Sequence, residues 1–209
     1  MAFDFKKAYK EFYQAKKIQI LNIPPINYVA VRGKGDPNEP NGAYQKAISK
    51  LYAISYTLKM SYKSDYKIKN FFEYVVPPLE GFWWQDNLSD VDYSKKYEFN
   101  FISLIRLPDF ISEDDFKWAV KTASQKKKID CSLVEFLNIN EGLCVQTMHI
   151  GSYDEEPQTI LKMKEFTNIN GYEFDVNNVR KHHEIYLSDP RKVAKEKLKT
   201  IIRIPIKAK

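Results

Sequence analysis

Residues 134–139, Val-Glu-Phe-Leu-Asn-Ile, repeat the pattern of residues 18–23, Ile-Gln-Ile-Leu-Asn-Ile, and this repetition decides the predicted fold. With a shift of 116 residues, the last three positions of the two stretches are identical. The order of the elements that follow also agrees, and such agreement counts for more than a few identities. We therefore predict a single domain, residues 1–209, made of two repeats at about 17–125 and 133–209.

The first repeat predicts strands and helices from its spacing of apolar residues. Residues 17–23 and 27–38 predict a hairpin of two strands and its exit loop, with Pro24 and Pro25 between them. Apolar residues three and four apart predict a helix from Tyr44 to about Met60. The remaining elements are a strand from Phe71 to the prolines at 77 and 78, an aromatic turn, a strand over 97–107 and a helix capped by Ser112.

The second repeat predicts the same order of elements. At the same shift, Val145 falls on Val29 and Gly151 falls on Gly35, and a helix opens after each glycine. The stretch His-His-Glu-Ile-Tyr-Leu-Ser, 182–188, then predicts a strand. We predict a last helix from Arg191, with Asp189 as its N-cap and Pro190 as its first residue.

These elements predict an α+β fold with a mostly antiparallel sheet and helices on one face. Two similar halves create a cleft between them, and ligands commonly occupy such clefts. Glu184 is the candidate polar group, because strand alternation places it with Tyr186 on one face and puts Ile185 and Leu187 on the other. An edge strand with its polar face in water is the simpler interpretation of this pattern.

Five long stretches carry a family resemblance that covers almost the whole chain. They are GKGDPN (Gly33 to Asn38), AISYTLKM (Ala53 to Met60), YVVPPLEGFWW (Tyr74 to Trp84), EGLCVQTMHIGSYDEEP (Glu141 to Pro157) and HHEIYLSDPRKVAKEKLKT (His182 to Thr200). With these stretches, the chain resembles the stand-alone members of the GyrI-like small-molecule-binding family. The resemblance implies a tandem pair of SHS2-type modules, which agrees with the repeat.

The resemblance also implies a function and a set of site residues. Close stand-alone relatives resemble cyclopropanoid cyclopropyl hydrolases, which add water to the strained rings of DNA-alkylating antibiotics. The family's pocket acid lies in a strand written E-I-Y, which matches Glu184 followed by Tyr186. The aromatic stretch supplies Trp83 and Trp84, which face opposite sides if they lie on a strand. Tyr56 completes the aromatic residues expected at the ligand.

Three further positions affect the expected site. His149 ends a predicted strand and is expected to line the cleft, although a structural histidine fits the same pattern. Arg32 stands where relatives often carry an acid, so an inward Arg32 would change ligand specificity. Lys195 occupies a place that proline often holds.

Composition excludes several other classes of protein. The 33 basic and 27 acidic residues are mostly dispersed, so we expect no specific binding to nucleic acid. Cys131 and Cys144 have no CxxC spacing, and the three histidines lack the spacing of a compact site, so neither a metal nor another cofactor is expected. Without a signal peptide or an apolar span, the chain is expected in the cytoplasm and off the membrane.

Two classes of function stay open from the sequence. As an enzyme, the chain would bind lipophilic, planar or cationic molecules and hydrolyse cyclopropyl rings, with Glu184 as the catalytic base. As a binding protein, it would sequester or sense such molecules without turnover. An inhibitor that contacts DNA gyrase, with an unknown protein partner, is the third alternative, which the family's founding name suggests.

Overall fold

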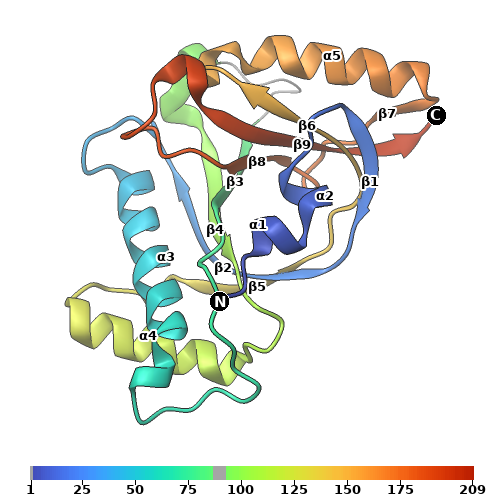
Figure 1. Cartoon of the computed structure of the whole chain (residues 1–209). Coiled ribbons are helices and arrows are strands. Elements are labelled where there is room, and N and C mark those ends of the chain that lie inside the picture. Colours follow the sequence, from blue (N-terminus) through green and yellow to red (C-terminus); the bar gives the residue numbers. More distant parts are fainter. Residues whose placement is uncertain (1, 87–92) are drawn as a thin grey trace.

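In the computed structural model, which describes residues 2–86 and 93–209, nine strands form one antiparallel sheet (Figure 1). Its order is β1-β6-β9-β8-β3-β4-β2-β5, with β7 paired to β9. The strands are β1 Gln19–Ile23, β2 Ile26–Lys34, β3 Leu79–Trp84, β4 Asn100–Arg106, β5 Glu135–Ile139, β6 Gly142–Ile150, β7 Tyr172–Phe174, β8 His182–Tyr186 and β9 Lys199–Ala208. The predicted α+β class is confirmed.

The predicted hairpin of residues 17–38 is wrong, although both of its strands exist. β1 pairs with β6, and β2 pairs with β4 and β5, so β1 and β2 do not pair with each other. Pro24 and Pro25 separate the two strands, and a proline holds the residue before it in an extended conformation. The chain therefore continues across the sheet at this point, where a hairpin would reverse it.

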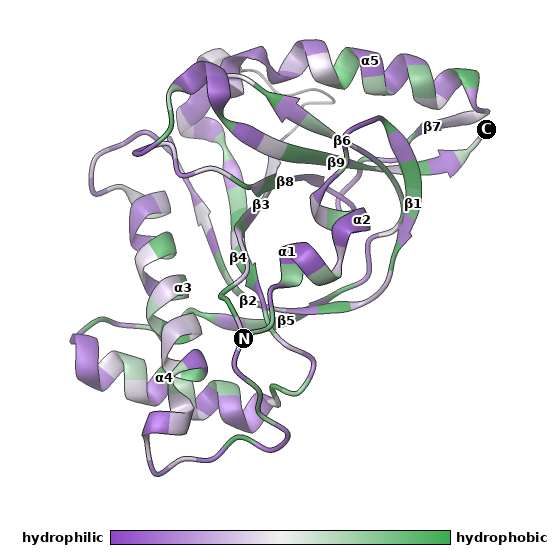
Figure 2. Ribbon diagram, viewed as in Figure 1, coloured by the Kyte–Doolittle hydropathy of each residue, from purple (hydrophilic) through white to green (hydrophobic). Residues whose placement is uncertain are grey.

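The long helices and the short ones lie on opposite faces of the sheet. The helices are α1 Phe5–Ala8, α2 Lys10–Tyr13, α3 Ala43–Lys59, α4 Glu113–Lys127 and α5 Glu156–Ile169, and the 3₁₀ turns are η1 Ser61–Lys63, η2 Tyr93–Glu98, η3 Tyr153–Glu155 and η4 Lys195–Lys197. Helices α3, α4 and α5 cover one face, as predicted, while α1 and α2 pack on the other. Figure 2 shows hydrophilic and hydrophobic residues interleaved along the outer helices, as amphipathic helices require.

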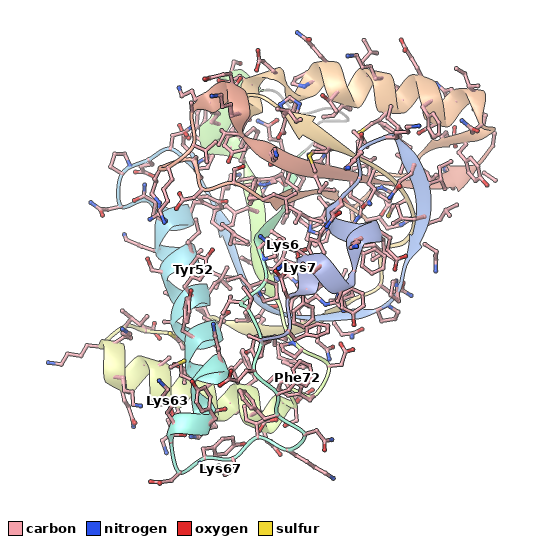
Figure 3. The ribbon with its side chains drawn as sticks, in the orientation of Figure 1. Lys6, Lys7, Tyr52, Lys63, Lys67 and Phe72 are labelled. Carbon is pink, nitrogen blue, oxygen red and sulfur yellow. The ribbon has the colours of Figure 1, made fainter. Side chains whose placement is uncertain are left out.

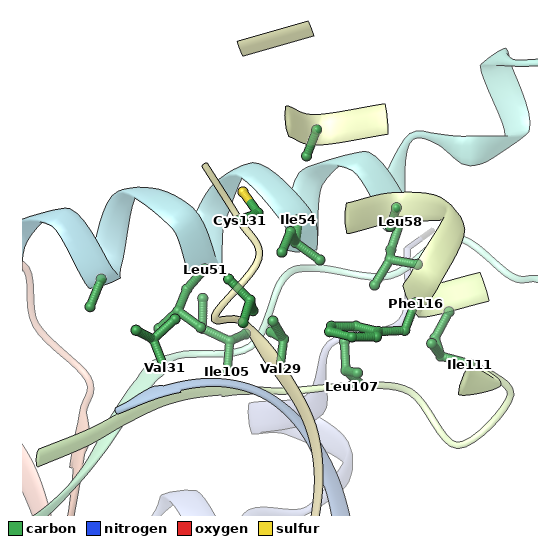
Figure 4. Packing of buried hydrophobic residues seen from close by; sticks show 14 of the residues in the cluster. Val29, Val31, Leu51, Ile54, Leu58, Ile105, Leu107, Ile111, Phe116 and Cys131 are labelled. Carbon is green, nitrogen blue, oxygen red and sulfur yellow. The ribbon is translucent and has the colours of Figure 1, made fainter. Parts of the chain in front are cut away.

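Helix α3 supplies much of the core on its side of the sheet. Leu51, Ile54 and Leu58 recur at three and four residues, and they pack against Val29 and Ile105 of β2 and β4 (Figure 4). All five are fully buried. Burial of one such side chain contributes about 1.5–3 kcal/mol, so this helix is stabilised mainly by its contact with the sheet. The predicted helix from Tyr44 to Met60 is confirmed to within one residue at each end.

Ser112 also caps α4 as predicted. Its hydroxyl accepts from the backbone of Asp115, and the Asp115 carboxylate accepts from the backbone of Ser112. This reciprocal pair is a capping box, which satisfies two donors at the helix start.

The predictions for residues 71–84 are wrong in detail. Phe71 to Pro78 contains no strand, and Tyr74 makes only an isolated bridge with Phe3. The strand β3 begins at Leu79, within the stretch that was predicted as an aromatic turn. Prolines 77 and 78 have no N–H to donate to a ladder, so regular pairing starts only after them.

The predicted helix from Arg191 is also wrong. Asp189 accepts hydrogen bonds from the backbone and the guanidinium of Arg191 and closes a turn, and the only helical structure that follows is the 3₁₀ turn Lys195–Lys197. Further along, Ile201 lies in β9, between β6 and β8. Pairing on both sides explains why the strand prevails, because each neighbour supplies a ladder of hydrogen bonds.

A network of buried charges lies beneath the centre of the sheet, on the face covered by α1 and α2. His183 Nδ1 lies 2.9 Å from Glu141 Oε2, and His183 Nε2 lies 3.0 Å from Glu80 Oε2. Arg203 donates to Glu141 at 2.7 Å and to Gln146 at 3.0 Å. Removing one member of such a network leaves an uncompensated buried charge.

We predict that Arg203→Met lowers the free energy of unfolding by about 3–5 kcal/mol, because Glu141 then keeps a buried charge with one partner fewer. The matched control is Arg32→Met, which removes an exposed pair with Glu135 and should cost about 0–1 kcal/mol. Urea unfolding of the three proteins measures both values. Equal losses in the two variants would contradict the central role of the network.

We predict that the stability falls at both acid and alkaline pH. Burial opposes ionisation of Glu141, but His183 and Arg203 outweigh it and lower its pKa to about 2, so its contribution is lost as the pH falls from about 4.5 towards 2. Burial lowers the pKa of His183, but Glu141 and Glu80 outweigh it and raise that pKa above 6.5, so its contribution is lost as the pH rises through the raised pKa. Urea unfolding between pH 3 and 9 tests this, and an unchanged acid limb in Glu141→Gln would refute it.

Candidate active site

A cavity of about 1500 Å³ lies on the sheet face that carries α3, α4 and α5. Its walls come from α3, β3, β8 and the start of α5, so both halves of the chain contribute. Tyr52 on α3 and Lys6 on α1, both labelled in Figure 3, are among the lining residues. Eight aromatic residues of the described part of the chain line it, namely Tyr44, Tyr52, Tyr56, Trp83, Phe99, Trp118, Tyr153 and Tyr186.

The pairing of β3 with β8 positions the central aromatic residues. Gly81 lies opposite Glu184, and Trp83 lies opposite His182. Trp83 Nε1 donates to the hydroxyl of Tyr186 at 2.7 Å, directly above Gly81. A Cβ on Gly81 would lie 2.8 Å from Trp83 Nε1, so glycine is required for this contact.

Two carboxyl groups and one imidazole meet inside the cavity. Strand alternation points His182 and Glu184 into it, and His182 Nε2 lies 3.1 Å from Glu184 Oε1. Glu156, the first residue of α5, is fully buried beside them. The ligand atoms of these three side chains all lie within 4.8 Å of one another.

The two glutamates form an electrostatically coupled pair. Burial, followed by the charge of the neighbouring Glu184, raises the pKa of Glu156 well above its usual value. Neither oxygen of Glu156 has a donor in contact among the described residues. A proton on Glu156, shared with Glu184 through a hydrogen bond, satisfies both observations, because burial and the neighbouring charge favour the neutral form of Glu156.

The tyrosines around this pair stay neutral. Burial and then Glu184 raise the pKa of Tyr153 to about 12, and the same causes raise the pKa of Tyr186 well above its usual value. Burial likewise raises the pKa of Tyr44. Neutral phenols next to acids can donate hydrogen bonds and can stack on planar ligands.

The structure brings four of the six predicted site residues to this cavity. Glu184, Tyr186, Trp83 and Tyr56 line it. Trp84 instead faces the other side of the sheet, as strand alternation requires for adjacent residues, and lines a second, smaller cavity.

His149 lies outside the lining of the large cavity among the described residues. Its ring nitrogens lie 2.9 Å from Thr159 Oγ1 and 2.9 Å from the backbone oxygen of Ser152, so both have local partners. Arg32 pairs with Glu135 on the opposite face, while Lys195 lines the large cavity.

Glu156, Tyr153 and His182 line the cavity but were not among the predicted site residues. Glu156 follows two acidic residues and precedes Pro157, a pattern typical of the start of a helix and not of a pocket. Only the packing of α5 on the sheet brings it to Glu184. With His182 and Glu184 it offers the mixed carboxylate and imidazole ligands that divalent metals accept, a grouping that the sequence analysis did not foresee.

We predict that Glu156→Gln stabilises the protein at alkaline pH. An acid whose pKa is raised by folding contributes stability below its unfolded pKa of about 4.5 and loses that contribution as the pH rises through the raised value. The neutral amide of the variant does not undergo this loss. The free energy of unfolding of the variant relative to wild type should therefore increase between pH 5 and pH 8, to on the order of 1–3 kcal/mol. Thermal melts at both pH values measure it, and a constant difference between them would contradict the shared proton.

The helices among residues 2–86 and 93–209 are all too short or too polar to cross a membrane. A search of curated proteins found no match.

Comparison with solved structures and family models gives closer relatives. A hydrolase from Listeria innocua is 43% identical with a TM-score of 0.89, and the match covers 98% of this chain and 100% of that one. An uncharacterized conserved protein from the same organism is also 43% identical, with a TM-score of 0.92 over 98% of this chain and 100% of that one. The C-terminal domain of EcmrR shares only the fold, at 13% identity and a TM-score of 0.54 over 92% of this chain and 98% of that one. The model of the GyrI-like small molecule binding domain matches residues 16–207, and the chain therefore belongs to this family.

Proposed function

We propose that this protein is a hydrolase that binds planar, lipophilic or cationic small molecules in the aromatic cavity and opens their cyclopropyl rings with water. The observation that carries the proposal is the pair of buried carboxyl groups, Glu156 and Glu184, in a cavity lined by aromatic side chains. The hydrolase from Listeria innocua, similar over its whole length, supports the reaction class.

The pair can divide the work of a general base and a general acid. Glu184, held by His182 at 3.1 Å, takes a proton from a water molecule as the water oxygen bonds to a ring carbon. The strained carbon–carbon bond breaks, and its electrons pass through the conjugated system to a carbonyl oxygen. That oxygen takes up a proton, for which Glu156, with its raised pKa, is the donor nearest to the base.

The aromatic walls account for the proposed ligand class. A planar ring system can stack between Trp83 and the tyrosines of α3, and a positively charged ligand gains about 2 kcal/mol from a desolvated aromatic face. The carboxyl pair favours cations further. The strained ring of the substrate is already reactive, so the protein has to supply a smaller rate enhancement. Orientation of the ring next to one base then accounts for much of that enhancement.

We predict that Glu184→Gln lowers the rate of hydrolysis by about 10²–10⁴-fold, since the amide cannot accept the proton of water. The assay incubates wild type and variant with a cyclopropane-bearing alkylating antibiotic and follows the ring-opened, water-added product by mass spectrometry. Glu165→Gln, an exposed change of the same kind on α5, is the control and should keep the wild-type rate.

Each outcome of this assay separates the candidate functions. Product from wild type and Glu165→Gln alone supports Glu184 as the base. Binding of the antibiotic without turnover by any of the proteins would make the chain a capturing protein. Equal turnover by all three would remove Glu184 from the mechanism.

A further inference from the structure

The second cavity lies on the opposite face of the same two strands. It has a volume of about 570 Å³, within the range of about 300–1,000 Å³ that small-molecule sites occupy. Trp84 and Phe82 of β3 line it, whereas Trp83 between them lines the large cavity. Lys181, the residue before β8, lines the second cavity, whereas His182, the first residue of β8, lines the large cavity. The two cavities are therefore back to back across one layer of sheet.

The second cavity has an apolar floor, and its lining also contains polar residues. Phe82, Ile102, Leu137 and Ile139 contribute side chains from β3, β4 and β5. The lining also includes Asn138, Asn140 and Asn178. An apolar floor with a few polar groups above it is the usual composition of a site for a small organic molecule.

The charges at this cavity are mainly positive. Its charged lining residues are Arg32, Glu141, Arg180 and Lys181. Glu141 is held by His183 and Arg203, so its carboxylate is already neutralised.

Two of the three cationic side chains already form ion pairs with carboxylates. Arg32 pairs with Glu135 at 2.9 Å, and Arg180 pairs with Asp175 at 2.6 Å. For Lys181, no carboxylate lies within 4.0 Å in the part of the chain comprising residues 2–86 and 93–209.

Lys181 is also held in place and partly desolvated. Its ammonium lies 4.6 Å from the centre of the Trp84 ring, which fixes the charge above the cavity wall. Partial burial lowers the pKa of Lys181, and the charge of Asp86, which makes no ion pair with it, opposes this shift only in part. An ammonium group in this position is stabilised when an anion replaces the water that it has lost.

We propose that the second cavity binds a small aromatic anion, with its rings on the apolar floor and its negative group at the Lys181 ammonium. The large cavity next to it carries the acidic pair and favours cations, so the two faces of β3 and β8 select ligands of opposite charge. This inference is independent of the proposed hydrolysis, since it uses none of the residues of the large cavity.

Two probes of equal ring structure test the role of charge. The anion 8-anilinonaphthalene-1-sulfonate and the neutral N-phenyl-1-naphthylamine are titrated into the folded protein, and the affinity is read from probe fluorescence. We expect Lys181→Glu to weaken the anionic probe by about tenfold or more, because attraction becomes repulsion in a partly desolvated site. Lys181→Gln should give an intermediate loss, and the neutral probe should change by less than about twofold.

The control variants locate the probe. Lys121→Glu makes the same change of charge on an exposed residue of α4 and should leave both probes unaffected. Trp84→Leu should lower the affinity for both probes, whereas Glu184→Gln in the large cavity should lower the affinity for neither. The proposal is overturned if the anionic probe binds Lys181→Glu and wild type equally, if Lys121→Glu has the same effect as Lys181→Glu, or if Glu184→Gln changes its affinity.

Discussion

The antiparallel pairing of Leu79–Trp84 with His182–Tyr186 is the contact on which the rest of the structure depends. It joins β3 to β8 at the middle of the sheet, with β9, β6 and β1 on one side and β4, β2 and β5 on the other. Because side chains alternate along both strands, this one register sends Trp83 and Glu184 to one face and Phe82 and His183 to the other. A slip of one residue would exchange the two faces and remove both cavities.

The buried charges on the face covered by α1 and α2 reinforce this register. Phe82 stacks on His183 with ring centres 4.1 Å apart, and His183 bridges Glu80 of β3 and Glu141 beside β6. One fully buried imidazole thereby connects β8, β3 and the residue before β6. A wrong register would leave these charges unpaired in the core, so the network specifies the native pairing as well as stabilising it.

On the face that carries α3, α4 and α5, the same strands hold carboxyl groups whose burial destabilises the fold and whose chemistry suits acid–base catalysis. Glu156 is buried beside Glu184 without a donor in contact, an arrangement that raises its free energy at neutral pH. Perturbed carboxyl groups in an aromatic cavity are typical of acid–base sites. Membership in the GyrI-like family and the similarity to a hydrolase from Listeria innocua agree with a small molecule as the ligand.

The sequence by itself determined the elements whose signals are local. The period of the apolar residues in Ala43–Lys59, the capping pair of Ser112 with Asp115 and the alternation in His182–Tyr186 each specify one element without reference to distant residues. The resemblance of the five stretches also identified Glu184 and Tyr186, which do line the large cavity.

Only the tertiary structure decided which strands pair and which acids meet. β1 pairs with β6 and β5 with β2, because ladder partners more than a hundred residues away outweigh local preference. β9 forms where a helix pattern extends from Arg191, because β6 and β8 pair with it on both sides. Glu156 and Glu184 are 28 positions apart in the chain, and no local signal links them. Trp83 and Trp84 were equivalent in the sequence, and they became different only when the register of β3 against β8 gave each a face.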